Sequence, residues 1–437
     1  QSQRNGIAKP IDVLLLQEQD GPTGDTQQIV NILNGIYGAG TYAHGNLVGG
    51  STDSSDRQTL IYNSGTIQFT PTLLPNLNDE AAIGSTASQP RQTMRYRLRP
   101  LSYDTSAQFY AYNSHYKAND DAASEAQRLV EANAIRINAD ALPDDTHIIF
   151  AGDHNFYRST DDAFERLTSA GDAQAKDPIN RIGNWHNTSS FSDIHTQAPC
   201  FSGCPAGFTT GGMDDRFDFQ LMTAEFLDGE GLDFIPGSYY SFGTNGSLPC
   251  CNSNINDPLN MVTFPGVTSF TQDEILNALF TASDHIPVVA DYQLPAVLNA
   301  VASMVPATLN VGQVFNLNVT VNNAANVLQP IGADELDYSV TTSGDLLGSF
   351  FNQVDAALGN AIVHPIGLST ATPGMKSGII TVASASQAVQ NGLIQIPISY
   401  QVLAATLDGD FNDDHTVDAA DYTVWRDGLG SLYDEND

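Results

Sequence analysis

The sequence predicts a mixed α/β domain followed by a β-sandwich domain and a short acidic tail. Up to about residue 292, short apolar runs alternate with stretches of helical spacing, whereas beyond it apolar and polar residues alternate one by one. The length of 437 residues also exceeds what one hydrophobic core normally organises. We place the three units at residues 1–295, 296–404 and 405–437.

Six apolar runs predict the strands of the first unit. They are IDVLLL (11–16), TLIYN (59–63), AQFYAYN (107–113), HIIFAG (147–152), FDFQLM (217–222) and IPVVADY (286–292). Between them, residues 121–140 carry apolar side chains near helical spacing. Residues 269–283 open with Thr271 and Glu274 at the spacing of a capping box. This mixture is typical of an α/β or α+β layered domain.

The second unit has the period-two pattern of strands buried on one face. Leu317, Val319 and Val321 alternate with polar residues, and the run around Ile396 and Ile398 does the same. Almost no charge interrupts the pattern, which favours an immunoglobulin-like β-sandwich. Nothing in this unit indicates chemistry.

The tail has the oxygen-ligand spacing of a calcium loop. Positions 1, 3, 5, 9 and 12 of an EF-hand-like loop are occupied by Asp410, Asn412, Asp414, Asp418 and Asp421. The pattern resembles a single type I dockerin repeat, which implies Ca²⁺ and attachment to a protein partner or surface. It departs from that repeat at His415, where glycine is usual, and at position 12, where Asp replaces Glu. A solvated acidic tail is the alternative.

Composition limits the classes of function. Seventeen basic and 50 acidic residues give a net charge of −33, which repels polyanions and argues against non-specific DNA binding. Phosphate chemistry would therefore need metal ions or local basic groups. Solubility in salty surroundings is the plainer explanation of the charge. No apolar run is long enough to cross a membrane.

The four cysteines lie in two close pairs inside Gly-, Pro-, Ser- and Asn-rich loops, Cys200 with Cys204 and Cys250 with Cys251. Two disulfides across these loops are favoured over a four-thiolate zinc site, because adjacent cysteines fit the usual ligand spacing poorly. The bonding pattern stays open. Disulfides, together with a chain that opens at Gln1, favour a protein secreted or held at the cell surface, with its export signal removed or outside this segment.

Polar side chains gather where the predicted strands begin or end. Glu18, His115 and the pair Asp153 and Asn155 each follow a strand, and the stretch Asp284–His285 precedes one. Taken singly, each has an ordinary explanation: a surface carboxylate, a rim histidine, or turn residues in GDHN. In a sheet with antiparallel neighbours these positions share one rim, so the side chains can converge.

Five motifs occur in the order of a known superfamily. They are Gln17-Glu18, Asn113-Ser114-His115-Tyr116-Lys117, Gly152-Asp153-His154-Asn155, Arg216-Phe217-Asp218 and Ser283-Asp284-His285. Over residues 11–292 the series resembles the endonuclease/exonuclease/phosphatase (DNase I-like) superfamily, which implies a two-layered αββα sandwich. The resemblance implies metal-assisted hydrolysis of a phosphate ester, but it does not choose the substrate.

The resemblance also implies roles for the motif residues. Glu18 would hold Mg²⁺ or Mn²⁺ with Asp284 near the metal, and Asp218 would orient His285 as general base. Asp153 and Asn155 would position water and phosphate, and His115 would stabilise or protonate the phosphoryl oxygens. The logic is physical as well: a phosphodiester anion repels hydroxide, so a cation must neutralise it while an imidazole generates the nucleophile.

This chain departs from the superfamily pattern at two places. The usual first strand, which ends in a metal-site asparagine, has no counterpart in the residues before Ile11, so we expect that strand to be missing and the metal site to be weakened. His154 stands where an aromatic residue is commoner, and its side chain is expected to point away from Asp153 and Asn155.

Four arginines at odd positions form the densest basic stretch: Arg91, Arg95, Arg97 and Arg99. On an extended strand they would share one face. The resemblance places a phosphate-contacting arginine near here, and we expect Arg91, Arg95 and Lys117 to bind substrate. An ordinary strand face paired with carboxylates is the alternative.

These observations together predict a secreted, Mg²⁺-dependent phosphoesterase that attacks its ester in line with water. The substrate class stays open among DNA, RNA, phospholipid headgroups, nucleotides and sugar phosphates. An extracellular nuclease in particular, or a non-catalytic surface protein that keeps the fold, are the alternatives.

Overall fold

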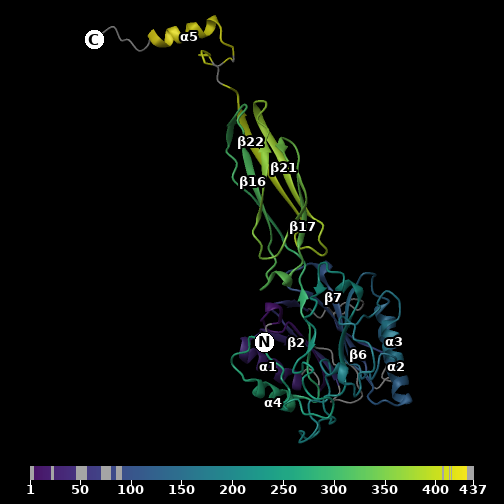
Figure 1. Ribbon diagram of the computed structural model, residues 1–437. Helices are drawn as coiled ribbons and strands as arrows, with labels where there is room; N and C mark the ends of the chain where they lie inside the picture. Colours follow the sequence, from purple (N-terminus) through teal and green to yellow (C-terminus); the bar gives the residue numbers. More distant parts are fainter. Residues whose placement is uncertain are drawn as a thin grey trace.

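The computed structural model describes residues 4–20, 24–45, 57–69, 80–84, 91–405, 408–412, 414 and 416–430. Figure 1 shows a mixed α/β domain, an elongated β-rich domain beside it and, beyond the far end of that domain, helix α5 (Ala419–Gly430). None of the helices in this described part of the chain combines the length and apolar character needed to span a bilayer.

A three-stranded antiparallel sheet begins the first domain. Its strands in spatial order are β1 (Val13–Gln19), β3 (Arg57–Asn63) and β2 (Tyr42–His44). Helix α1 (Asp25–Tyr37) covers the outer face, where Val30 packs with Ile61 and Tyr42. The alternating apolar residues of β1 explain this, because Leu14 and Leu16 face the helix while Val13 and Leu15 face the opposite side.

The second sheet carries most of the predicted site residues. Its strands are β4 (Ile67–Gln68), β5 (Glu80–Ile83), β6 (Thr93–Pro100), β7 (Phe109–His115), β8 (His147–Asp153) and β9 (Asp218–Met222). The order is β4-β6-β7-β8-β9 with β5 also paired to β6, and only β7 and β8 run parallel. Helices α2 (Ala122–Ala139) and α3 (Asp162–Thr168) pack on its outer face.

The two sheets share an apolar core. Leu60 of the first sheet packs with Met94, Ala111 and Ile149 of the second in one buried cluster. The layers therefore run α1, first sheet, second sheet, α2 with α3. The predicted mixed α/β class is confirmed, as are the helix expected within residues 121–140 and the capping box of Thr271 and Glu274, which begins α4 (Gln272–Ala282).

The strand expected over residues 286–292 is wrong as a single core strand. The run makes two short pairings instead: β12 (Val288–Val289) with β11 (Tyr240–Ser241), and β13 (Tyr292–Gln293) with β10 (Asp233–Phe234). The reason lies in the partner segment, which turns at Pro236 and at Gly237, whose φ is +82°, so the ladder is interrupted between β10 and β11.

Both disulfides are local. Cys200 bonds to Cys204 and Cys250 bonds to Cys251, and no cysteine is free. Each bond therefore closes a loop within one pair, so the two cysteine-bearing loops are not joined to each other. The local pairing favours disulfides over the four-thiolate zinc alternative.

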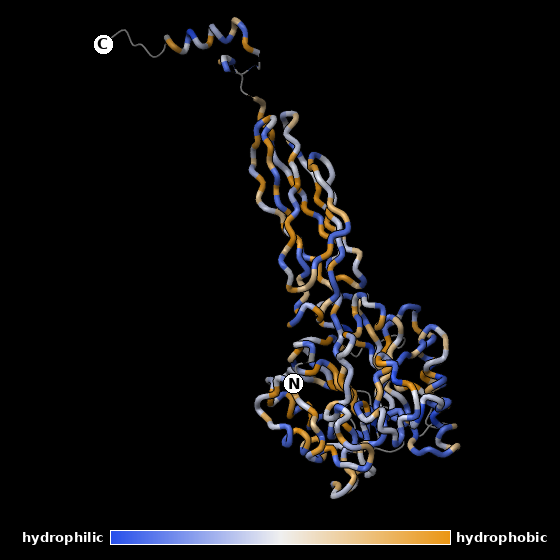
Figure 2. Tube along the Cα trace, in the orientation of Figure 1, coloured by the Kyte–Doolittle hydropathy of each residue, from blue (hydrophilic) through white to orange (hydrophobic). Residues whose placement is uncertain are grey.

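The β-rich domain consists of two sheets. Its strands are β14 (Leu298–Ala302), β15 (Thr308–Asn310), β16 (Asn316–Asn323), β17 (Leu336–Thr342), β18 (Leu346–Leu347), β19 (Phe350–Asp355), β20 (Ile362–Leu368), β21 (Gly374–Ser384) and β22 (Leu393–Leu403). The sheet orders are β14-β16-β20-β18 and β15-β22-β21-β17-β19. Apolar residues of both sheets form one buried cluster, and the alternation along the strands is visible in Figure 2.

Acidic side chains lie where the two domains meet. Asp334 of the β-rich domain accepts a hydrogen bond from the backbone N–H of Gly231 at 2.9 Å, and the Tyr103 hydroxyl donates to the carbonyl of Pro295 at 2.8 Å. Burial is the main cause that raises the pKa of Asp334 to about 6, and Glu230 adds repulsion. The pKa of Asp233 is likewise raised to about 6, mainly by burial.

These raised pKa values predict that the free energy of unfolding falls as pH rises through the range in which Asp334 and Asp233 lose their protons. A carboxyl whose folded pKa exceeds its unfolded value of about 4 holds more protons in the native state, so its contribution is lost between about pH 4 and pH 6. We expect Asp334→Asn to flatten this loss and to raise stability at pH 7 by about 1 kcal/mol, after allowance for solvent screening. Urea unfolding at several pH values checks this, and an unchanged pH slope in Asp334→Asn would contradict it.

Candidate active site

The second sheet brings three of the expected residues to one row. In the parallel pair β7–β8, His115 lies opposite Asp153, and in the antiparallel pair β8–β9, Asp153 lies opposite Asp218. The end of β7, the end of β8 and the start of β9 therefore meet at a single edge. Side chains that are far apart in the chain become neighbours through strand register alone.

His285 reaches this edge from a loop and pairs with Asp218. Its Nδ1 lies 2.6 Å from the Asp218 carboxylate, and its Nε2 lies 3.9 Å from the Asp153 carboxylate. An isolated bridge between Gln197 and His285 fixes the backbone of the loop. Asp218 is itself anchored, because its N–H donates to the Thr196 hydroxyl at 3.1 Å.

Charge around His285 favours its protonated form. Burial opposes the charged imidazolium, but attraction to Asp218, the hydrogen bond with it and attraction to Asp153 outweigh burial and raise the pKa of His285 to about 10. For Asp218, burial again works against ionisation, yet His285 prevails and holds the pKa of Asp218 below its ordinary value. The two side chains thus form an imidazolium–carboxylate pair, and His285 becomes a base only when it is made neutral.

Asp153 and Asn155 form a rigid turn at the end of β8. The Asp153 carboxylate accepts hydrogen bonds from the backbone N–H of Asn155 at 2.9 Å and from its side-chain amide at 2.8 Å. Asn155 has a φ of +50°, and its amide also donates to the carbonyl of Tyr116 at 3.1 Å. Burial is the main cause that raises the pKa of Asp153, although His285 and His115 lower it.

His115 links Asp153 with the first sheet. Its Nε2 lies 3.3 Å from the Asp153 carboxylate and 3.6 Å from the Glu18 carboxylate. Glu18 was expected to follow the first strand. It lies instead within β1, at a bulge where the pairing register with β3 shifts. Its φ of +54° turns the strand there.

The fit of these residues to a divalent cation is partial. The Glu18 side chain is 59% exposed at the edge of the cluster, and a solvent-accessible carboxylate of this kind suits a hard cation. Asp284 accepts a hydrogen bond from the backbone N–H of Thr209 at 2.9 Å, and no described contact joins it to Glu18. The structure therefore brings Glu18 to the cluster but does not show the second expected ligand beside it.

The expected substrate-binding residues separate into two groups. The Arg91 guanidinium donates to the carbonyl of Tyr116 at 3.0 Å, the same carbonyl that Asn155 contacts, so it lies next to the cluster. Arg95 alternates with buried residues along β6, as predicted, but it bonds Asn138 of α2 at 3.0 Å on the helix-covered face. Arg95 therefore contacts helix α2, and Arg99 of the same strand donates to Gln68 of β4 at 2.6 Å.

Lys117 follows the end of β7, and its backbone is held by buried groups. Its N–H donates to Glu131 at 3.0 Å, and its carbonyl accepts a hydrogen bond from Arg128 at 3.0 Å. The segment that carries His115 and Lys117 is thus fixed to helix α2. His154 points away from the edge that holds His115, Asp153 and Asp218, as predicted, because it is wholly buried between Phe156, Phe219 and Tyr116.

Sequence reasoning missed Gln197. Its side-chain amide nitrogen lies 2.6 Å from Nε2 of His285. If Nδ1–H donates to Asp218, the lone pair on Nε2 accepts from this amide, which defines one tautomer of the neutral ring. Gln197 lies in an irregular loop with no periodic pattern, so the sequence gives no sign of its role. Its contact with His285 becomes visible only in the structure, where it follows Thr196 and forms a backbone bridge to His285.

Gly152 allows strands β7 and β8 to approach next to Asp153. Its φ is +121°, and a Cβ atom there would collide with the backbone carbonyl of Ser114. We expect Gly152→Ala to destabilise the domain by roughly 1–3 kcal/mol and to displace Asp153. Thermal unfolding measures the first effect. Gly35→Ala in α1 is the matched control, because a Cβ there meets nothing within 4 Å, and equal losses in both variants would contradict the interpretation.

The tail residues lie apart from this cluster. Both oxygens of Asp421 accept backbone hydrogen bonds, from Phe411 at 2.7 Å and from Asp418 at 2.7 Å. Asp410 accepts from the N–H of Asp414 at 3.1 Å. The expected ligands Asn412 and Asp414 are joined by a side-chain hydrogen bond, whereas His415 lies outside the described residues.

Comparison with known proteins finds similarity to solved structures only. No protein-family model matches the chain, and no curated protein matches it. The human Nocturnin catalytic domain is 13% identical, with 64% of this chain and 80% of that chain covered and a TM-score of 0.38. An endonuclease/exonuclease/phosphatase from Beutenbergia cavernae is 13% identical over 89% of this chain and 90% of that chain, with a TM-score of 0.36.

A further similar structure is TDP2 of D. rerio in complex with a single-strand DNA product. It is 14% identical, covers 64% of this chain and 86% of that chain, and has a TM-score of 0.38. At such low identity and TM-score, the function must be inferred from the cluster itself.

Proposed function

We propose that the first domain is a metal-dependent phosphoesterase whose active site is the cluster around His285. The observation that carries this proposal is the arrangement of His285 between Asp218 at 2.6 Å and Asp153 at 3.9 Å. A binding scaffold has no need of an imidazole oriented by a buried carboxylate. A hydrolase does, because the carboxylate selects the tautomer and stabilises the imidazolium that forms when the ring takes a proton from water.

The chain's own residues divide the work of hydrolysis. His285, once neutral and once its Nε2 is released from the Gln197 amide, accepts the proton of the attacking water at Nε2, and Asp218 stabilises the resulting charge at Nδ1. The Asn155 amide donates to Asp153 and to the carbonyl of Tyr116, so it can reach a phosphate oxygen only by releasing one of these bonds, and His115 donates a hydrogen bond to the phosphate. Arg91 offers the local positive charge that the net charge of −33 denies to an anionic ester.

Glu18 is the residue that would hold Mg²⁺ or Mn²⁺, with Asp284 completing the ligand set only if its loop moves. When bound, such a cation would neutralise phosphate charge and, by repulsion, favour the neutral form of His285. The first test is hydrolysis of bis(4-nitrophenyl) phosphate by the full chain with added Mg²⁺ or Mn²⁺. A rate that follows protein concentration and disappears with a chelator supports the proposal, whereas no rate with either metal contradicts it.

Small phosphodiesters or nucleotides are the substrate class that we favour. The acidic surface weighs against a non-specific nuclease, since attraction to the phosphate backbone dominates such binding. An extracellular nuclease remains the alternative within the enzyme class. The same assay with a plasmid, single-stranded DNA and RNA separates the two, because a nuclease would prefer these polymers.

We further propose that the protein is secreted or exposed at the cell surface, and that the β-rich domain acts as an immunoglobulin-like spacer. The bond between Cys200 and Cys204 supports an oxidising location. A non-catalytic surface protein that keeps the fold is the competing class, and the phosphodiester assay decides between them.

The tail is proposed to bind one Ca²⁺ ion and to attach the protein to a partner or surface. We expect calorimetric titration of the full chain with Ca²⁺ in excess Mg²⁺ to show one site that Asp410→Ala and Asp421→Ala each weaken about tenfold or more, because each removes one charged ligand. Asp427→Ala, in the exposed helix beyond the loop, is the control. Heats that do not change in the two loop variants would make the segment an acidic tail.

A further inference from the structure

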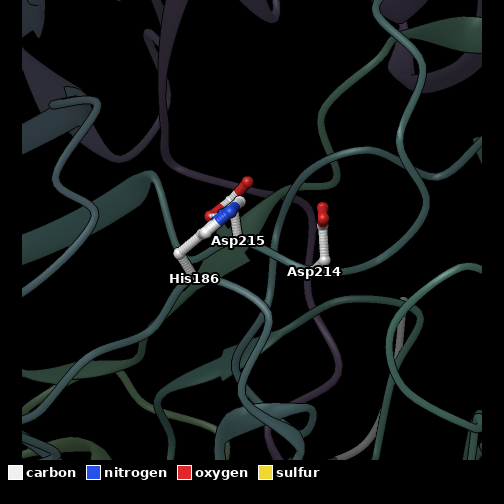
Figure 3. Close-up of side chains that lie close together, drawn as sticks. All are labelled: His186, Asp214 and Asp215. Carbon is white, nitrogen blue, oxygen red and sulfur yellow. Dashed lines mark hydrogen bonds and ion pairs between the residues drawn. The ribbon is translucent and has the colours of Figure 1, made fainter. Parts of the chain in front are cut away.

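A second cluster of potential ligands lies on the loops between α3 and β9. Among the described residues, one group of histidine and carboxylate side chains has ligand atoms that all lie within 4.8 Å of one another: His186, Asp214 and Asp215. Figure 3 shows the three side chains extending to the same side of their loops. None of them belongs to the proposed active site.

The backbone beneath this cluster is held in place. The N–H groups of Asp214 and Asp215 both donate to the carbonyl of Gln197, at 3.0 and 3.1 Å. The N–H of Asn187, the residue after His186, donates to the carbonyl of Asp214 at 2.8 Å. The two loops are thereby joined, so the side chains have fixed origins before any ligand arrives.

The carboxylates are buried without a permanent cation. Asp214 is 9% exposed and Asp215 is 7% exposed. Among the described residues, the Asp214 carboxylate interacts with the imidazole of His186, with its own backbone amide and with the carboxyl of Asp215. Two adjacent carboxyl groups that face each other in a buried site repel unless a proton or a metal ion lies between them. The partners of Asp214 thus belong to the cluster itself, whose three ligand atoms lie within 4.8 Å of one another.

Negative charge accumulates around the cluster, where the ligand atoms of Asp214 and Asp215 lie within 4.8 Å of each other. Asp120 adds further repulsion, and the nearby Arg158 is already engaged by Asp120 and by Glu125. Within the part of the chain that the structure describes, no Arg or Lys forms an ion pair with Asp214 or Asp215, in a chain whose net charge is −33.

The histidine has the surroundings of a metal ligand. Its Nδ1 lies 2.7 Å from the nearer oxygen of Asp215, and its Nε2 lies 2.7 Å from the Asn187 amide. If Nδ1 binds a metal, Nε2 must carry the proton, and the Asn187 amide accepts from it after a rotation that exchanges its oxygen and nitrogen. The His186 side chain is 40% exposed, which leaves a path for an ion and an open coordination position.

We propose that His186, Asp214 and Asp215 bind a divalent transition-metal ion of the Zn²⁺ class. One imidazole nitrogen and two carboxylate oxygens suit such an ion better than Mg²⁺ or Ca²⁺, which prefer oxygen ligands alone. The site is separate from Glu18 and from the tail. A cation at this site would also hold the loop that carries Gln197. The carbonyl of Gln197 accepts from the N–H groups of Asp214 and Asp215, and its side chain contacts His285.

The test is titration of the metal-free full chain with Co²⁺, a visible-absorbing substitute for Zn²⁺, in excess Mg²⁺ and Ca²⁺ to occupy oxygen-only sites. We expect one equivalent of Co²⁺ to bind, to be displaced by Zn²⁺, and to be lost in Asp214→Asn/Asp215→Asn. Asn187→Ala should weaken binding roughly 10- to 100-fold, because it removes the partner that orients His186.

The matched control is Asp144→Asn/Asp145→Asn, which removes the same charge from an exposed adjacent pair in the turn after α2. His186→Gln provides a second variant at a partly exposed position, should the double variant fail to fold. The proposal is overturned if the native chain binds no Co²⁺, if the site variants retain the equivalent, or if the control loses it equally. The first of these results would leave a shared proton between the two carboxyl groups.

Discussion

The His285→Ala variant is expected to hydrolyse bis(4-nitrophenyl) phosphate about 100- to 10,000-fold more slowly than the native chain. Among the side chains that the structure describes, only the His285 ring contacts the Asp218 carboxylate, at 2.6 Å, and also faces Asp153. Its removal takes away the acceptor of the water proton. Initial rates at saturating Mg²⁺ measure the effect.

The His285 variant needs two controls. His44→Ala removes an imidazole in strand β2, outside the cluster, and should keep the native rate. Circular dichroism must show that His285→Ala is folded. Rates within a factor of three of the native chain, measured on folded protein, would remove His285 from the mechanism, and native-like rates in His44→Ala are required for the comparison to count.

Asp161→Ala is expected to destabilise the first domain by about 3–5 kcal/mol. The Asp161 carboxylate bonds the Arg128 guanidinium at 2.7 and 3.0 Å, and the side chains are 1% and 0% exposed. Removal of the carboxylate leaves a buried charge without its partner. Arg128 also donates to the carbonyls of Lys117 and Asn119, so the segment that follows His115 should loosen as well.

Urea unfolding followed by Trp185 fluorescence measures this change, because that indole is completely buried in the first domain. Asp162→Ala is the matched control: the residue is adjacent in sequence and exposed, so its loss should change stability by less than about 0.5 kcal/mol. If Asp161→Ala unfolds at the same urea concentration as Asp162→Ala, the buried ion pair does not stabilise the domain.

Local patterns predicted several of the elements but not their neighbours. The apolar runs at β7 and β8 and the helical spacing of α2 are visible in the sequence, because burial of one face imposes a period. The proximity of His115, Asp153 and Asp218 depends on which strands pair and in which register, and no local pattern carries that information. The motif order was needed to expect these three residues together.

The remaining errors have physical causes. The arginines of β6 alternate as predicted, yet Arg95 faces a helix. The sequence could not reveal this, because an exposed strand face and a helix-covered face with paired arginines have the same alternating pattern. Arg128 and Arg216 are buried against Asp161 and Asp177, a state that composition does not predict, since unpaired arginine is normally exposed. Gln197 and the metal-ligand cluster belong to irregular loops, whose geometry is set by tertiary contacts.

Chemical rescue tests most directly whether the imidazole of His285 does the proton transfer in this cluster. Free imidazole added to folded His285→Ala should restore part of the metal-dependent hydrolysis, with a rate that rises with the concentration of neutral imidazole, while the native chain is unaffected. If imidazole restores nothing and the native chain itself shows no metal-dependent hydrolysis, the cluster is not a phosphoesterase site.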